Sequence, residues 1–177
     1  QNEESLTFWI DKYNNINNLP KLEYKMINFQ ELQNNLKKYQ KNIFSKNSRL
    51  FMYFISLIPI LNIFKNLNIY LHDLDIVAEL SIFEDLKISA GKSYHVKMHS
   101  NSLNFIFLNE FGYDTLTANG NFESDKDGFS KLTKSLSIGS LNTLGYRFSF
   151  SLIFNPSIYI FFLYMLTKVS KNLENPY

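Results

Sequence analysis

The stretch FGYDTLTANGNFESDKDGF, from Phe111 to Phe129, lies between two apolar segments that have helical periodicity. It places three glycines, Asp114 and several Ser, Thr and Asn residues in a chain that is otherwise rich in Phe, Ile and Leu. A metal site, a phosphate-binding loop and a structural turn would each leave a different pattern of residues here. Gly112 and Gly120 favour the structural turn, because glycine fits positive φ angles and confined backbone positions.

Apolar side chains at helical spacing predict a helix on each side of this stretch. The first would be capped by Ser100 or Asn101, and Gly112 would close it as the residue after its end. The second would begin near Gly128 and stop at Gly139. The inward-facing residues would be Leu103, Ile106, Phe107 and Phe111 in the first helix, and Phe129, Leu132 and Leu136 in the second.

Three strands are predicted upstream of the first of these helices. LNIYL (67–71) and YHVKM (94–98) alternate apolar with polar residues, and DIVAELSI (75–82) follows a turn at His72 and Asp73. A short strand containing Phe122 is predicted within the opening stretch itself.

The N-terminal part predicts two helices. An amphipathic helix starts after Asn28, which forms a variant of the capping box with Glu31. The run LFMYFISLIPILNIF, from Leu50 to Phe64, is apolar nearly all round and favours a buried core helix. It has 15 residues and contains Pro59, whereas a bilayer span needs about 20 residues.

The C-terminal part has no charged residue from Phe148 to Leu166. Alternation between Phe148 and Phe154 predicts a strand, and Asn155 followed by Pro156 predicts the start of a helix that is apolar from Ile158 to Leu166. Together these elements predict an α+β fold with an antiparallel or mixed sheet covered by helices. Residues 1–64 would form a helical N-terminal segment, and residues 65–177 the α+β domain.

The composition excludes several classes of chemistry and disfavours a nucleic-acid partner. The chain has no cysteine, so disulfides, thiolate nucleophiles and Cys-ligated zinc are absent. Net charge is only +2, and Arg49 and Arg147 are the only arginines, unlike the dense basic stripe of a nucleic-acid binder.

No catalytic or metal-binding motif is present, and we predict neither catalytic residues nor a metal site. His95 and His99 would lie about 13 Å apart along a strand, too far to share one ion. His72 lies beside Asp73 and Asp75 but matches no ligand spacing, so a polar turn is the simpler interpretation. Gly91-Lys92-Ser93 lacks the upstream glycine of a phosphate-binding loop.

Residues from about Tyr70 to Leu144 resemble a sterol-carrier-protein-like domain. The resemblance rests on the strand YHVKMH, the helix SNSLNFIFLNEFG, the segment DTLTANGNFES and the helix GFSKLTKSL. It implies that Asp114 caps a short turn, that Leu116 anchors this turn inward, and that Gly120 opens the strand containing Phe122.

The resemblance also implies an apolar tunnel for fatty acyl or sterol-like ligands between sheet and helices. Ordinary core packing is the alternative role for its candidate lining. That lining comprises Leu103, Phe107, Phe111, Leu116, Phe122, Phe129 and Leu132.

A narrower resemblance links GYDTLTANGNF and IGSLNTLG to the region that follows the catalytic domain in some metallo-β-lactamase-fold hydrolases. Their zinc-binding histidines lie in the preceding domain, so this resemblance implies no catalytic residue and no cofactor in this chain. We therefore expect a cytoplasmic, non-catalytic tail that binds an apolar small molecule and follows a catalytic domain. The alternative is a membrane-associated protein that contacts lipid through residues 50–64 and 157–170.

Overall fold

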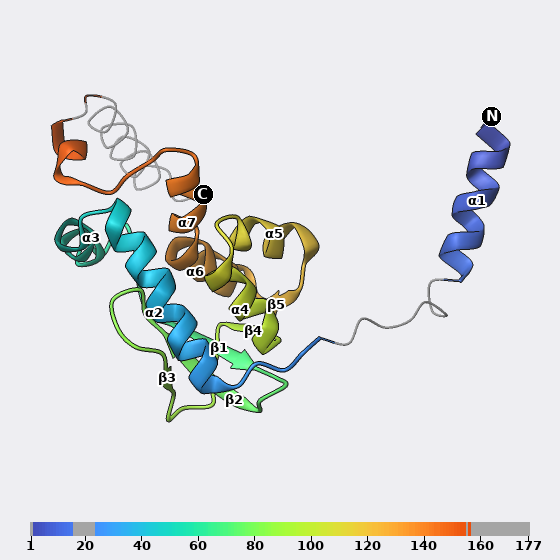
Figure 1. Ribbon diagram of the computed structural model, residues 1–177, viewed down its shortest axis with the longest axis horizontal. Helices are drawn as coiled ribbons and strands as arrows, with labels where there is room; N and C mark the ends of the chain where they lie inside the picture. Colours follow the sequence, from blue (N-terminus) through green and yellow to red (C-terminus); the bar gives the residue numbers. More distant parts are fainter. Residues whose placement is uncertain (1, 16–23, 155, 157–177) are drawn as a thin grey trace, which may run out of the picture.

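A five-stranded mixed sheet forms one layer of the fold, and helices lie against it (Figure 1). The computed structural model describes residues 2–15, 24–154 and 156. The strands lie in the order β3-β2-β1-β4-β5, and β1 pairs with β4 in parallel whereas the other neighbouring strands are antiparallel. Their bounds are β1 Leu67–Leu71, β2 Ile76–Leu80, β3 Lys87–Ile88, β4 Val96–Met98 and β5 Phe122–Ser124. The predicted α+β class is confirmed, and β3 is a strand that the sequence did not indicate.

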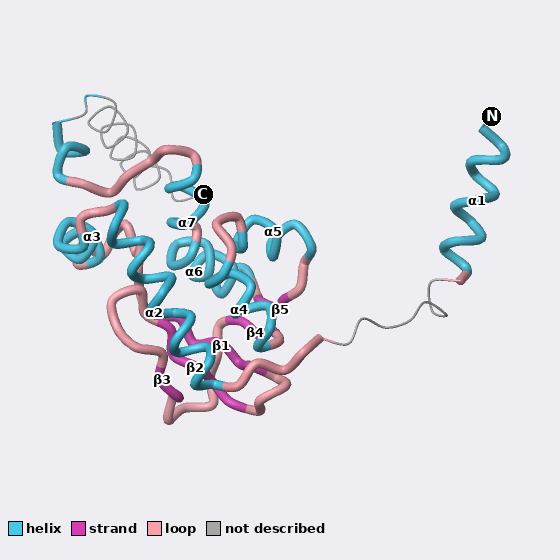
Figure 2. The backbone as a smooth tube through the Cα atoms, viewed as in Figure 1, coloured by secondary structure: helices cyan, strands magenta, loops and turns pink. Residues whose placement is uncertain are grey.

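The two faces of the sheet differ as the alternation in β1 predicts. Leu67, Ile69 and Leu71 are buried, whereas the residues between them are partly exposed. The opposite face carries polar pairs such as Lys97 with Glu123, whose charged atoms lie 3.1 Å apart. Figure 2 shows α4, α5, α6 and α7 gathered above the strands, with α2 crossing them.

Helix α2 (Phe29–Lys46) confirms the predicted amphipathic helix. The Asn28 side chain caps it by accepting a hydrogen bond from the Glu31 amide at 2.9 Å. Leu32, Leu36, Tyr39 and Ile43 are buried and share one core with the sheet residues. The hydrophobic core therefore runs across the predicted boundary between residues 64 and 65.

Helix α3 (Arg49–Ser56) corrects the prediction of a buried helix from 50 to 64. It ends before Pro59, which lacks an amide hydrogen and disfavours helical geometry in the preceding residue. Asn62 and Phe64 then adopt positive φ angles of 48° and 54°, so the segment after α3 is irregular. Only Phe51, Met52 and Ser56 of α3 are buried. Within the described residues, no helix has both the length and the apolarity needed to cross a bilayer.

Helix α4 (Ser100–Leu108) and helix α5 (Gly112–Asn119) correct the predicted role of Gly112. Helix α4 ends four residues before Gly112, and Gly112 begins α5. A Cβ atom on Gly112 would lie 2.6 Å from the Ile106 Cα atom, so glycine is needed for close approach and not for a turn. The opening stretch is therefore largely helical.

Of the two residues with predicted roles around this segment, Gly120 has the predicted position and Asp114 does not have the predicted role. Asp114 lies in the first turn of α5 and is not the predicted cap, because the N-cap position is Phe111, which makes no side-chain hydrogen bond to the helix. Gly120 precedes β5, as predicted, and it also ends α5 with a φ angle of 64°.

Helix α6 (Lys126–Leu136) begins near Gly128, as predicted, and Asp125 caps it by accepting a hydrogen bond from the Gly128 amide at 2.6 Å. Gly139 does not stop this helix. It lies inside α7 (Ile138–Thr143), where an added Cβ would lie 3.1 Å from the Tyr39 hydroxyl. Packing against α2 and not helix termination explains the glycine.

The strand predicted from Phe148 to Phe154 is wrong, because this segment forms a 3₁₀ helix, η2 (Phe150–Phe154). The backbone of Phe148 is already hydrogen-bonded at the start of α3. Its amide donates to Asn47 Oδ1, and its carbonyl accepts from the Ser48 amide, both at 2.8 Å. Asn155 and the helix predicted from 158 to 166 lie outside the described residues. Helix α1 (Asn2–Asn14) precedes the rest of the fold, and its described side chains are exposed.

Candidate functional site

The seven candidate lining residues do not surround one cavity. Leu103, Phe107, Leu116 and Leu132 are buried in the common core. Phe111 and Phe129 are exposed, and Phe122 stacks on Phe129 with ring centroids 6.0 Å apart. Three surface hollows in the described part of the chain each take one of the seven: Phe107, Leu116 or Phe122.

Two of these hollows adjoin and form the candidate site, which we call the Tyr24 cleft. Their volumes are about 230 and 290 Å³, and they share Tyr24, Ser102 and Asn121. Helices α4 and α5 line one hollow, and the end of β4 and the start of β5 line the other. The remaining lining is Asn101, Phe105, Thr115, Leu116 and Asn119 in the first, and His72, Lys97, Met98, His99, Gly120, Phe122 and Glu123 in the second.

The parallel pairing of β1 with β4 creates this site. Leu71 at the end of β1 lies opposite Met98 at the end of β4. The residues that follow these two strands therefore meet at one edge of the sheet, although they are 27 positions apart in sequence. His72 and Asp73 follow β1, and His99 and Ser100 follow β4.

His99 lines the second hollow of the cleft, next to the start of α4. Its Nδ1 atom accepts a hydrogen bond from the Asn101 amide at 3.1 Å, so a neutral ring carries its proton on Nε2. Its ring contacts those of Tyr24 and His72, with centroid distances of 5.6 and 5.5 Å. The His99 side chain thus caps α4 and forms part of an aromatic wall.

Asp73 forms hydrogen bonds with Ser100, the first residue of α4. Its two carboxylate oxygens accept hydrogen bonds from the Ser100 amide at 2.8 Å and the Ser100 hydroxyl at 2.5 Å. Ser100 Oγ in turn accepts a hydrogen bond from the Ile27 amide at 2.8 Å, which ties the segment containing Tyr24 to the cleft. Ser100 is fully buried, and its hydroxyl links Asp73 to the Ile27 amide as part of the support of the cleft.

No family model, curated protein or solved structure matches this chain. Function is therefore inferred from the residues themselves. Within the described ranges, no group of three His, Asp or Glu side chains is placed to hold a metal ion.

His95 is not among the residues that line the Tyr24 cleft. Its Nδ1 accepts a hydrogen bond from the Asn68 amide at 2.9 Å. Partial burial, with a smaller contribution from nearby Lys131, lowers the pKa of His95, while Asp125 opposes this effect. The folded chain therefore prefers the neutral imidazole.

This preference predicts a pH dependence of stability. A histidine whose pKa is lowered on folding contributes stability above the unfolded pKa of about 6.5, and this stability is lost as pH falls toward the folded pKa. We expect the urea midpoint of the wild-type chain to fall more between pH 7.5 and pH 5 than that of His95→Gln, whose side chain accepts a hydrogen bond without titrating. Equal falls in both proteins would contradict the prediction.

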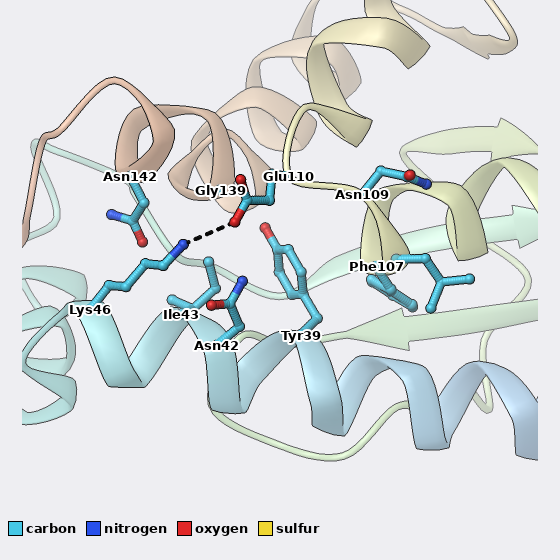
Figure 3. A pocket seen from close by; sticks show the side chains of 10 residues that line it. Tyr39, Asn42, Ile43, Lys46, Phe107, Asn109, Glu110, Gly139 and Asn142 are labelled. Atoms are coloured by element: carbon cyan, nitrogen blue, oxygen red, sulfur yellow. Dashed lines mark hydrogen bonds and ion pairs between the residues drawn. The ribbon is translucent and has the colours of Figure 1, made fainter.

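The third hollow is too small for an organic ligand. It has a volume of about 50 Å³, enough for a few water molecules, and lies between α2, the end of α4 and α7 (Figure 3). Lys46 and Glu110 form an ion pair across it at 3.3 Å. The Tyr39 hydroxyl donates to the Leu136 carbonyl at 3.2 Å, and burial raises the pKa of Tyr39, so this phenol is a neutral structural link.

Proposed function

We propose that the chain is a non-catalytic, sterol-carrier-protein-like domain that binds a small amphipathic molecule in the Tyr24 cleft. The observation that carries this proposal is the composition of the cleft wall. Phe105 and Phe122, which are at least partly exposed, offer apolar surface for a hydrocarbon part, and the buried side chains of Leu116 and Met98 adjoin them. His72 and His99 supply polar groups at the strand ends. Pockets with mostly apolar walls and a few placed polar groups are typical of small-molecule sites.

The order of elements supports the sterol-carrier-like part of the proposal. The resemblance rests on a strand, a helix, a short segment, a strand and a helix, and the chain has β4, α4, α5, β5 and α6 in that order. The short segment differs, because it is the eight-residue helix α5.

Chain-length dependence of binding tests the ligand class. Each buried methylene contributes about 0.8 kcal/mol, so affinity should rise about fourfold per methylene along a series of alkyl carboxylates until the cleft is full. Isothermal titration calorimetry and thermal shift measure this dependence. A series without any thermal shift at any chain length would refute the ligand proposal.

A matched pair of variants locates the binding site. Asn121 is exposed and is shared by both hollows, so Asn121→Trp should fill the cleft and abolish the chain-length dependence. Ser93→Trp adds the same side chain at an exposed position that does not line the cleft, and it should bind like the wild type. Equal loss of binding in both variants would place the ligand elsewhere.

We further propose that the domain is the accessory part of a metallo-β-lactamase-fold hydrolase, as the narrower resemblance implies. The reading frame upstream of Gln1 tests this idea independently of ligand binding. An HxHxD motif there would support it, and a start codon directly before Gln1 would contradict it.

The exposed apolar residues of α3 support membrane association as a second candidate function. Tyr53, Phe54 and Leu57 are at least half exposed. Recovery of the full chain in the high-speed supernatant without detergent favours the binding domain, whereas recovery only with detergent favours membrane association.

A further inference from the structure

One side of helix α3 carries apolar side chains that are exposed in the described part of the chain. We call them the outward stripe, which comprises Leu50, Tyr53, Phe54 and Leu57, each between 50% and 58% exposed. Their i, i+3, i+4, i+7 spacing places them on one helix face, and a continuous exposed apolar patch of this kind marks an interaction surface. Figure 1 shows α3 beyond the end of α2 and away from the strands, so this face is accessible to a large partner.

The charged residues around the outward stripe have predominantly one sign. The whole chain has 18 basic and 16 acidic residues, but residues 32–72 contain no Asp or Glu. Residues 128–154, whose Phe150 ring packs on Phe51 at 5.0 Å, contain none either. The basic residues of these two segments are Lys37, Lys38, Lys41, Lys46, Arg49, Lys65, Lys131, Lys134 and Arg147.

Two of these basic residues lie at the two ends of α3. Arg49 is its first residue, one turn before Tyr53, and donates a hydrogen bond to the Phe83 carbonyl at 3.1 Å. Lys65 donates to the carbonyl of Ser56, the last residue of α3, at 2.6 Å. Both interactions use neutral carbonyl oxygens, so both side chains keep their positive charge without an acidic partner among the described residues.

Acidic residues of neighbouring elements do not cancel these two charges. They are already in ion pairs with lysines, namely Asp85 with Lys37, Glu110 with Lys46 and Glu84 with Lys87. Each pair contributes no net charge. The outward stripe therefore lies between two unpaired positive charges, Arg49 and Lys65.

We propose that the outward stripe docks on an anionic lipid surface, with Arg49 and Lys65 beside the lipid head groups. This inference rests on membrane association, the second candidate function, and specifies the lipid and the residues that contact it. Helices that lie at a lipid boundary place aromatic and aliphatic side chains on one side and Lys or Arg next to them. Each Lys or Arg close to an anionic bilayer strengthens binding about fivefold.

A second copy of the chain fits the outward stripe less well. Two stripes packed antiparallel would bring Arg49 of each copy to the Lys65 end of the other, and two packed in parallel would bring Arg49 to Arg49. Like charges therefore meet in both arrangements.

Helix α1 is a natural control for this argument. Leu6 and Ile10 are also at least half exposed, so exposure alone would make α1 an equal candidate for lipid contact. Its charged residues have the opposite balance, with three acidic residues against Lys12. An anionic surface should therefore select α3 and not α1.

Flotation of the full chain with vesicles tests the proposal. We expect vesicles with about 30% phosphatidylserine to bind the chain at least about tenfold more tightly than vesicles of phosphatidylcholine alone, and high salt to remove most of this difference. Equal affinity for both vesicles would overturn this inference and leave membrane association in place. Binding to neither would refute both. The ligand proposal for the Tyr24 cleft is measured without vesicles and stands apart from these results.

Two variants with matched controls locate the contact, and circular dichroism checks that all of them fold. Phe54→Gln with Leu57→Gln should weaken binding to the anionic vesicles at least about tenfold, whereas Leu6→Gln with Ile10→Gln on α1 should not change it. Equal loss in both double variants, or loss only in the α1 variant, would overturn the proposal.

The second variant tests the charges. Arg49→Gln with Lys65→Gln should abolish the preference for phosphatidylserine. Lys92→Gln with Lys126→Gln removes the same net charge at exposed positions outside α3 and should keep the preference. Equal effects would show a response to net charge only and would overturn the proposal. Dimerisation that Phe54→Gln with Leu57→Gln abolishes, without vesicle binding by the wild type, would assign the stripe to a second copy and overturn it as well.

Discussion

Gly128→Ala is expected to lower the free energy of unfolding by about 3 kcal/mol or more. An added Cβ would lie 2.0 Å from the carbonyl oxygen of His95 and 2.9 Å from its carbonyl carbon. Both atoms belong to the backbone just before β4, so neither can rotate aside as a flexible side chain would. The steric clash can be relieved only if α6 moves away from the sheet that it covers.

Urea denaturation followed by far-UV circular dichroism measures this effect, with Gly91→Ala as the matched control. The nearest atom to a Cβ on Gly91 is Ser89 Oγ at 3.9 Å, which is ordinary contact. The control should therefore keep or slightly raise the free energy of unfolding, by up to about 1 kcal/mol. Equal midpoints for both variants would show that α6 does not approach β4 as described.

Leu132→Ala is expected to cost about 2–5 kcal/mol, because Leu132 is fully buried one turn after Gly128. This result would also decide between the two roles considered for Leu132. A core residue leaves a cavity when truncated and destabilises the fold, whereas a tunnel-lining residue would enlarge the space for a ligand.

Phe129→Ala is the control for this second variant. Phe129 lies on the same helix but is 43% exposed, so its truncation should cost clearly less than that of Leu132. Unchanged stability of Leu132→Ala together with stronger uptake of alkyl carboxylates would contradict the core assignment. Thermal unfolding with and without the alkyl carboxylate provides both measurements.

Local patterns in the sequence predicted the elements that depend on local chemistry. Helix α2 follows from a capping residue and a continuous apolar stripe, and β1 follows from strict alternation. Gly120 was also predictable, because a left-handed φ angle at a helix end is a local demand.

Other features depend on contacts between distant parts of the chain. Glycine is favoured at positions 112 and 139 because the backbone there lies close to Ile106 and Tyr39. No local pattern in the sequence reveals these contacts. The alternation from Phe148 to Phe154 predicted a strand, but the backbone of Phe148 is hydrogen-bonded to Asn47 and Ser48.

The Tyr24 cleft was missed for the same reason. His72 and Asp73 were predicted to form a simple polar turn, and His99 was considered only with His95. Recognising that β1 and β4 are parallel neighbours would have brought His72 and His99 to one edge of the sheet. The hint in the sequence was that a histidine directly follows each of these two strands.

The two outermost strands of the sheet are very short, with two residues in β3 and three in β5. Each therefore leaves few free amide and carbonyl groups along its edge, and Lys87 and Glu123 place charges there. Strand addition by a neighbouring molecule needs a longer uncharged row of such groups. The short, charged edge strands therefore disfavour fibril growth from this sheet, although 45% of the residues in the chain are hydrophobic.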